Sequence, residues 1–238
     1  MRINKVFLFF ISFFLIAPIY SEDVDEIIVT ALKRSSTVQD TPASITAISS
    51  TDIEERGITN MHDLKHIIPN MNFTNILGSQ NITIRGIGEF NGQPGVSVST
   101  DGVFQSRSHS SQLGEMDLDR VEVLRGPQGT LYGRNSVGGV VNLITKNPSA
   151  DRDGYVKVGY GNYETSTLET AIGGGITENT SYRLVLHSTE QGKGYLDCLN
   201  AGCGEQGYTD RLAYRLKISS DINEKVSANL MIDRKSVV

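Results

Sequence analysis

Residues 120–148 have the sequence RVEVLRGPQGTLYGRNSVGGVVNLITKNP, and this stretch decides which fold the chain adopts. Val121 and Val123 alternate with charged residues and predict a β-strand, and Val140 to Ile144 predict a second one. Between the two strands, five glycines surround a tyrosine that we expect to be exposed, Tyr132. A phosphate-binding loop would need the pattern GxxxxGK[ST], and neither its spacing nor its lysine is present. We therefore interpret the glycines as structural.

Short apolar runs upstream predict further strands of the same domain. They are Ser44 to Ile48, the segment NITIRGI with Ile82 and Ile84, and VSVSTDGVFQ at 96–105. In the last run, Asp101-Gly102 has the composition of a two-residue hairpin turn. Residues 40–149 are therefore expected to form one compact α+β domain.

Two short helices are expected between the first two of these strands. Thr51 and Glu54 fit a capping box, and Gly57 can end the helix that they begin. Asn60 would cap the second helix, which presents three apolar residues on one face before Pro69: Met61, Leu64 and Ile68.

His62 and His66 lie four residues apart on the second helix. A zinc site needs three or four ligands, and no HExxH glutamate stands between these histidines. We interpret the pair as part of a solvated helix face, and the sequence predicts neither a metal site nor a cofactor.

The chain begins with the features of a secretory signal. Met1, Arg2 and Lys5 form a basic start, and Val6 to Tyr20 is almost entirely apolar. This run is shorter than the roughly 20 residues that a transmembrane helix needs. We expect residues 1–21 to be a signal peptide, followed by a flexible tail at 22–39 whose EIIVTA segment is prone to β-structure.

Residues 150–238 change to long segments in which apolar and polar residues alternate. The clearest of five such segments places Leu212, Tyr214, Leu216 and Ile218 on one face and Arg211, Arg215 and Lys217 on the other. One face suits lipid and the other suits water, as in the strands of a membrane barrel. Gln191 to Asp210 would form a longer outer loop, and in an exported protein its Cys198 and Cys203 are expected to form a disulfide rather than a metal site.

Five strands cannot close a barrel, which needs an even number of at least about eight in a single chain. An open sheet edge in lipid would leave backbone groups without partners. From the sequence we expect an incomplete barrel, in an N-terminal fragment of a larger protein.

The charge of the chain excludes one class of partner. Its formal net charge is -5, with 21% charged residues. The composition therefore provides no basic footprint for nucleic acid.

The order of these parts resembles the TonB-dependent outer-membrane receptors along nearly the whole mature chain. DEIIVTALKR at 25–34 is similar to the TonB box, ITIRGIG at 82–88 and VSTDGVFQ at 98–105 are similar to plug motifs, and residues 120–148 resemble the plug signature. The resemblance implies an α+β plug domain followed by antiparallel transmembrane β-barrel strands. The complete barrel would have about 22 strands, and the plug would block its lumen.

Two sets of residues take roles from this resemblance. Arg85 and Arg125 match arginines that in the family bind acidic groups on the inner barrel wall and so latch the plug. Such partners matter because breaking a buried ion pair costs about 3–5 kcal/mol. The TonB box would pair as a strand with TonB, the energised inner-membrane partner, through six residues: Glu26, Ile27, Ile28, Val29, Thr30 and Ala31.

The function that the resemblance implies is active uptake of a scarce large solute, most often a ferric siderophore, by a receptor surrounded by outer-membrane lipid. No catalysis and no cofactor are expected. The residues expected to face the ligand lie at the plug apices: Phe90, Asn91, Gln93, Gln105, Arg107, His109 and Gln112.

Two alternatives come from other classes of function. An exported plug-type binding or signalling module without transport would explain the short length, but five amphipathic strands would be exposed on a soluble protein. An enzyme would need catalytic geometry, which adjacent residues such as Asp117 and Asp119, or Ser108, His109 and Ser110, do not establish. We interpret these residues as parts of solvated loops.

Overall fold

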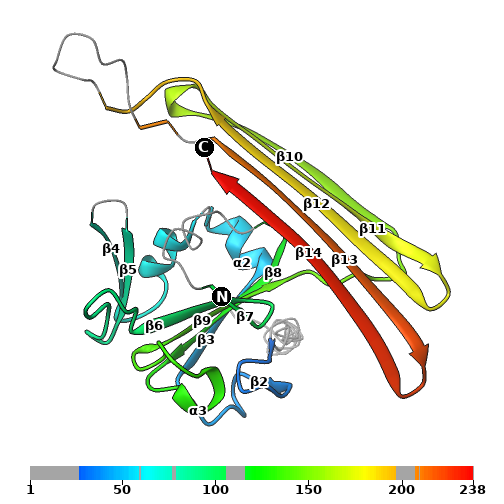
Figure 1. The fold of residues 1–238 in the computed structure, drawn as a ribbon, viewed down its shortest axis with the longest axis horizontal. Helices are drawn as coiled ribbons and strands as arrows, with labels where there is room; N and C mark the ends of the chain where they lie inside the picture. The colour runs from blue at the N-terminus through cyan, green and yellow to red at the C-terminus, as the bar shows by residue number, and fades with distance from the viewer. Residues whose placement is uncertain are drawn as a thin grey trace, which may run out of the picture.

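The computed structural model describes residues 27–58, 60–76, 79–105, 116–196, 207–208 and 210–237. An α+β domain lies beside one face of five long antiparallel strands, which we call the strand wall (Figure 1). The predicted signal peptide lies outside the described residues. Among those described, no helix is long and apolar enough to cross a membrane.

The α+β domain is built on a five-stranded sheet. Its strand order is β3 (Ile45–Ser49), β8 (Leu118–Arg125), β9 (Gly139–Thr145), β6 (Val96–Thr100) and β7 (Val103–Phe104). β9 pairs antiparallel with β8 and parallel with β6. The two strands predicted within residues 120–148 are therefore confirmed as adjacent strands at the centre of the sheet.

The hairpin predicted at Asp101-Gly102 is also confirmed. It joins β6 to β7, and both turn residues have positive φ, 48° and 83°, as a type I′ turn requires. A second hairpin pairs β4 (Met71–Ile76) with β5 (Ser79–Ile84). Only β5 was predicted, through Ile82 and Ile84.

The first helix, α2 (Ser50–Glu55), begins two residues earlier than predicted. Ser49 is its N-cap and accepts a hydrogen bond from the backbone N–H of Asp52 at 3.1 Å, so the capping box assigned to Thr51 is wrong. Both pairs fit the capping pattern, but Ser49 is the residue at which β3 ends and the chain turns. Gly57, at φ 61°, follows the helix as predicted.

The second predicted helix is the 3-10 helix η1 (Met61–His66), and its apolar face is buried as expected. It covers the core between the sheet and the β4–β5 hairpin. Residues from all these elements share the core: Ile48, Met61, Leu64, Ile68, Phe73, Ile82, Val121 and Leu143.

The strand wall contains five neighbouring strands in chain order, as predicted. They are β10 (Asp153–Gly161), β11 (Thr165–Thr177), β12 (Thr180–Gln191), β13 (Arg211–Asn223) and β14 (Val226–Val237), with the 3-10 turn η3 (Asn162–Glu164) between the first two. Four of them have 12 or 13 residues, longer than the ten expected.

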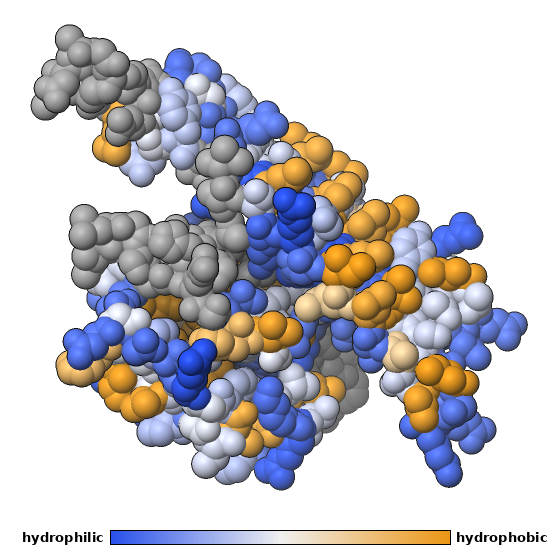
Figure 2. All heavy atoms as spheres, in the orientation of Figure 1, coloured by the Kyte–Doolittle hydropathy of each residue, from blue (hydrophilic) through white to orange (hydrophobic). Residues whose placement is uncertain are grey.

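The two faces of the strand wall differ as the alternation predicted. Apolar residues on the outward face are exposed, including Val158 at 79% and Leu212 at 58%, and part of this apolar surface is visible in Figure 2. On the inward face, Arg183, Arg215 and Lys217 are buried. The outward face is therefore suited to lipid, and the inward face holds charged side chains against the α+β domain.

One glycine of the quoted stretch sits where a side chain does not fit. A Cβ on Gly139 would lie 2.4 Å from the backbone oxygen of Leu124, whereas a Cβ on Gly129 would meet nothing within 4 Å. We predict that Gly139→Ala lowers the free energy of unfolding by about 2 kcal/mol, because the β8–β9 pairing must shift. Gly129→Ala is the matched control and should be neutral or slightly stabilising. Chemical denaturation followed by circular dichroism measures both, and equal stability of the two variants would contradict the close packing at Gly139.

Candidate functional site: the N-terminal segment and the interface with the strand wall

The N-terminal segment, residues 27–31, lies against the α+β domain as a very short strand. Within it, β1 (Ile28–Val29) pairs antiparallel with β2 (Ser36–Thr37). Val29 is only 1% exposed, while Ile28 is 57% exposed. The segment is therefore held partly by main-chain pairing and partly by its small buried side chains.

A buried carboxylate in the central sheet holds the next residue of the segment. Glu122, in β8, is fully buried, and its Oε1 accepts hydrogen bonds from the Thr30 backbone N–H at 2.9 Å and from Arg120 Nε at 2.8 Å. Asn142 Nδ2 contacts the other carboxylate oxygen at 3.5 Å. Because a buried charge is costly without donors, the Thr30 amide contributes to the stability of this carboxylate as well as to docking.

Tyr132 holds the end of the segment. It lies in the single-turn helix α3 (Gly129–Tyr132), and its hydroxyl donates to the Ala31 carbonyl oxygen at 2.7 Å. Burial, and secondly the charge of Glu122, raise the pKa of Tyr132 to about 12, so the hydroxyl keeps its proton at physiological pH. The expectation that Tyr132 is exposed is wrong, because the N-terminal segment covers it.

The docked segment packs outside the main core. Val29 and Ala31 form a small cluster with Ile45, Leu124 and Val140. The cluster that contains η1 and the β4–β5 hairpin is a different one. The segment can therefore leave the domain without opening its main core.

A bidentate ion pair joins the α+β domain to the strand wall. Arg183 of β12 donates to both carboxylate oxygens of Asp117, and its Nη1 donates to Asp153 Oδ1 at 2.6 Å. The side chains of Arg183 and Asp117 are 3% and 1% exposed. Asp117, which we expected in a solvated loop, is thus a buried anchor just before β8.

Strand β13 extends the same interface. Arg215 Nη1 donates to the Met116 carbonyl oxygen at 3.1 Å, and its Nε donates to Asp233 Oδ2 at 2.8 Å. Lys217 Nζ lies 3.0 Å from Asp101 Oδ2 and donates to the Thr145 carbonyl oxygen at 3.2 Å. The wall therefore supplies cations, and the domain supplies carboxylates and carbonyl oxygens.

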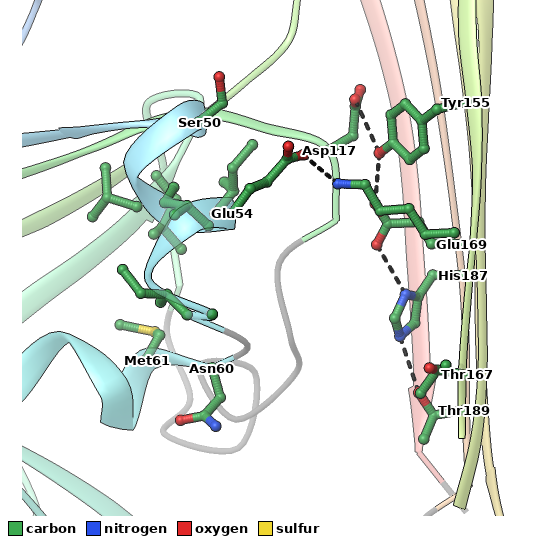
Figure 3. A pocket seen from close by; sticks show the side chains of 18 of the residues that line it. Ser50, Glu54, Asn60, Met61, Asp117, Tyr155, Thr167, Glu169, His187 and Thr189 are labelled. Atoms are coloured by element: carbon green, nitrogen blue, oxygen red, sulfur yellow. Dashed lines mark hydrogen bonds and ion pairs between the residues drawn. The ribbon is translucent and has the colours of Figure 1, made fainter. Parts of the chain in front are cut away.

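A cavity of about 980 Å³ lies between the wall and the side of the domain that carries α2 and η1 (Figure 3). Tyr155 links Asp117 to Glu169, and His187 contacts Glu169 Oε2 at 3.1 Å and Thr189 Oγ1 at 3.1 Å. Lys157 pairs with Glu54 across the cavity, and this ion pair lowers the pKa of the Glu54 carboxyl.

Several predicted site residues can be placed. Phe90 and Gln93 form a hairpin closed by Asn91 and Gly92, and Phe90 is 79% exposed. Gln105 follows β7, and its backbone N–H donates to the Val98 carbonyl oxygen. The first residue of the predicted TonB box and five other predicted residues lie outside the described residues: Glu26, Arg107, His109, Gln112, Cys198 and Cys203. No group of three or more metal-binding side chains occurs in the part that is described.

Of the two arginines predicted to latch the plug, Arg125 is the last residue of β8 and Arg85 directly follows β5. Arg85 Nη2 donates to Ser44 Oγ at 3.3 Å, and the Nε of Arg125 is buried without a hydrogen-bond partner. Their pairing with acidic groups of a barrel stays a prediction. The anchors at Asp117, Arg183, Arg215 and Lys217 were not predicted, although three of these are basic residues on the polar face of alternating strands.

We predict that Asp117→Asn loosens the interface strongly. Arg183 then faces a neutral amide at position 117 and keeps only the half-exposed Asp153 as a carboxylate partner, so we expect a cost of about 3 kcal/mol, the lower end for a broken buried pair. The control Glu54→Gln breaks an ion pair whose side chains are 60% and 50% exposed, and it should cost less than about 1 kcal/mol. Thermal unfolding in detergent measures both, and a loss for Asp117→Asn as small as that of the control would contradict the anchoring role.

We also predict that Glu122→Gln releases the N-terminal segment more often. Trypsin cleavage after Lys33 or Arg34 should accelerate about tenfold, because proteolysis of the native state follows the population of the open form. Tyr132→Phe, which removes only the bond to Ala31, should act in the same direction, and Glu55→Gln on the exposed face of α2 is the control. Unchanged cleavage in both test variants would show that these bonds do not hold the segment.

Comparison with protein families gives a direct match. Residues 37–140 match the family model of the TonB-dependent Receptor Plug Domain. This range contains four strands of the five-stranded sheet and the first two residues of β9. It ends before the strand wall.

Two curated relatives extend the match. The pesticin receptor of Yersinia pestis is 30% identical over 166 residues, covering 68% of this chain and 24% of the relative. The ferric enterobactin receptor of Pseudomonas aeruginosa is 32% identical over 189 residues, covering 68% and 25%. The chain thus spans about a quarter of the length of these relatives.

Solved structures share the fold of both parts. The ferric yersiniabactin uptake receptor of Yersinia pestis matches with a TM-score of 0.73 and 25% identity, covering 81% of this chain and 31% of that one. The ferripyoverdine receptor of Pseudomonas aeruginosa matches in fold with a TM-score of 0.74 at 22% identity, covering 89% and 27%. With a plug domain followed by strands like those of receptor barrels, the chain belongs to the TonB-dependent receptors.

Proposed function

We propose that this chain is the plug and the first barrel strands of an outer-membrane receptor that imports a ferric siderophore with energy from TonB. The plug closes the lumen, and the outward face of the wall contacts lipid. Residues 26–31 are the segment that TonB binds and pulls. The chain performs no catalysis in this role. It binds a solute, blocks the pore and changes shape under force.

The observation that carries the proposal is the way in which the N-terminal segment is docked. Besides the Thr30 hydroxyl, which contacts Glu122 and Arg120, it is held by a two-residue strand pairing, a hydrogen bond from the Thr30 N–H to Glu122 and a hydrogen bond from the Tyr132 hydroxyl to the Ala31 carbonyl oxygen. Most of these contacts use the main chain of the segment, and main-chain hydrogen bonds are what a partner provides when it adds a strand. TonB would therefore replace the bonds to β2, Glu122 and Tyr132 by pairing with the same main chain.

The proposed substrate class rests on the names of the relatives. They include receptors named for ferripyoverdine, ferric enterobactin and ferrioxamine B, all of which are iron chelates. For this chain, we infer that the exposed hairpin at Phe90, Asn91 and Gln93 contacts the chelate from the plug side. Gln105, Arg107, His109 and Gln112 complete the proposed contacts.

Substitutions at Ile28 test the role of the main chain. The side chain is 57% exposed, so Ile28→Ala preserves the backbone donor and should leave uptake within about twofold of wild type. Ile28→Pro removes the backbone N–H that pairs with the added strand of TonB. Iron uptake through the full-length receptor should therefore fall about tenfold or more. Binding of the chelate to cells should be the same in both variants.

Uptake of a radiolabelled iron chelate by cells carrying the full-length receptor gives the readout. Wild-type uptake that depends on TonB, with a loss only in Ile28→Pro, supports the proposal. Equal uptake by the proline and alanine variants would mean that the segment does not pair with TonB as a strand. Chelate binding without any TonB-dependent uptake would instead favour a binding or signalling module.

A further inference from the structure

The inward face of the strand wall is organised in rows of residues that are paired across neighbouring strands. The row of Arg183 and Lys217 and the next row, with Arg215, contact the plug. The following row carries Glu169 and His187. The next row, in which β13 begins, consists of Gly159, Thr167, Thr189 and Arg211.

Arg211 differs from the other inward-facing basic residues of β12 and β13. Arg183, Arg215 and Lys217 each pair with a carboxylate. Arg211 forms no ion pair or hydrogen bond through its guanidinium among the described residues, and its Nε is buried without a partner. It lines the cavity between plug and wall. A half-buried guanidinium without an anion is an incomplete site, because its planar donors are suited to a bidentate oxyanion.

The neighbours of Arg211 in its row add hydroxyl groups. Thr189 is directly opposite Arg211, and Thr167 is opposite Thr189. The hydroxyl of Thr167 occupies space that a side chain at position 159 would fill, since a Cβ there would lie 2.4 Å from Thr167 Oγ1. The row therefore places two hydroxyls and a guanidinium side by side, without a carboxylate, and of the two hydroxyls Thr189 Oγ1 also lies 3.1 Å from His187 Nε2.

The acidic groups that line the cavity are already paired. Glu54 pairs with Lys157, Asp117 with Arg183, and Glu169 with His187 and Tyr155. None of these three contacts Arg211. The positive charge of Arg211 is therefore available to a ligand in the cavity, and a hydrogen bond from the Thr167 hydroxyl would add to its attraction for oxygen atoms.

We propose that Arg211, with Thr167 and Thr189, binds the negatively charged oxygen atoms of an anionic iron chelate in the cavity between plug and wall. This inference rests on the proposed function and names the charge class of its substrate. The cavity, at about 980 Å³, is of the size of a pocket for a large small-molecule ligand. Neutral or cationic chelates would gain nothing from Arg211.

Binding of three iron chelates of different charge to the full-length receptor in detergent tests the proposal. The probes are an anionic ferric tris-catecholate, a neutral ferric tris-hydroxamate and the cationic ferrioxamine B. Wild type should prefer the tris-catecholate, and added salt should weaken its binding. Arg211→Gln should raise the Kd for it about tenfold and reduce the salt dependence, and Arg211→Lys, which keeps the charge without the planar donors, should lie between.

The control is Arg234→Gln. Arg234 lies on neighbouring β14, is exposed, and pairs in register with Tyr214 rather than with the inward row. Its substitution should leave the Kd within about twofold of wild type. Preference for the neutral or cationic chelate, or an unchanged Kd in Arg211→Gln, would overturn the inference while the proposed function stands. Failure of wild type to bind any of the three chelates would refute the proposed function itself, and the inference with it.

Discussion

The buried pair between Asp117 and Arg183 fixes the position of the plug against the strand wall, and the rest of the site depends on it. Asp117 directly precedes β8, the strand that carries Glu122 and leads into the glycine-rich turn with Tyr132. A bidentate pair between two nearly fully buried side chains has one well-defined geometry. Because this end of β8 is anchored to the wall, the docking groups for the N-terminal segment keep a fixed place relative to the barrel.

The contacts between plug and wall differ in chemistry from the contacts that hold the N-terminal segment on the plug. This difference explains how the segment can detach while the plug stays bound to the wall. The plug is held to the wall by two desolvated ion pairs, Asp117–Arg183 and Asp101–Lys217, and removing one partner of such a pair is costly. The N-terminal segment is held by a few hydrogen bonds and two small apolar side chains, each worth about 1 kcal/mol or somewhat more. A pull on the segment should therefore undock it first, leaving Glu122 with Arg120 and Asn142.

The sequence predicted those features that depend on local pattern. The turn at Asp101-Gly102, the two strands within residues 120–148 and the two faces of the wall follow from residue type and a period of two. Features that depend on contacts between distant segments were not predictable in this way. Tyr132 is covered by Ala31, 101 positions away, and Asp117 is buried by Arg183, 66 positions away. The cap at Ser49 was misplaced because two overlapping pairs fit the same pattern, and only the end of β3 decides between them.

The most direct test of the account is a pair of distances measured by spin labels in the full-length receptor, with and without the periplasmic domain of TonB. The first distance is between labels at Ile28 and at Glu55 on α2, and the second is between labels at Glu55 and at Glu190 near the end of β12. All three positions are exposed. The account predicts that TonB shifts or broadens the first distance and leaves the second unchanged. An unchanged first distance together with a changed second one would mean that the plug moves as one body with its segment, and that result would contradict the account.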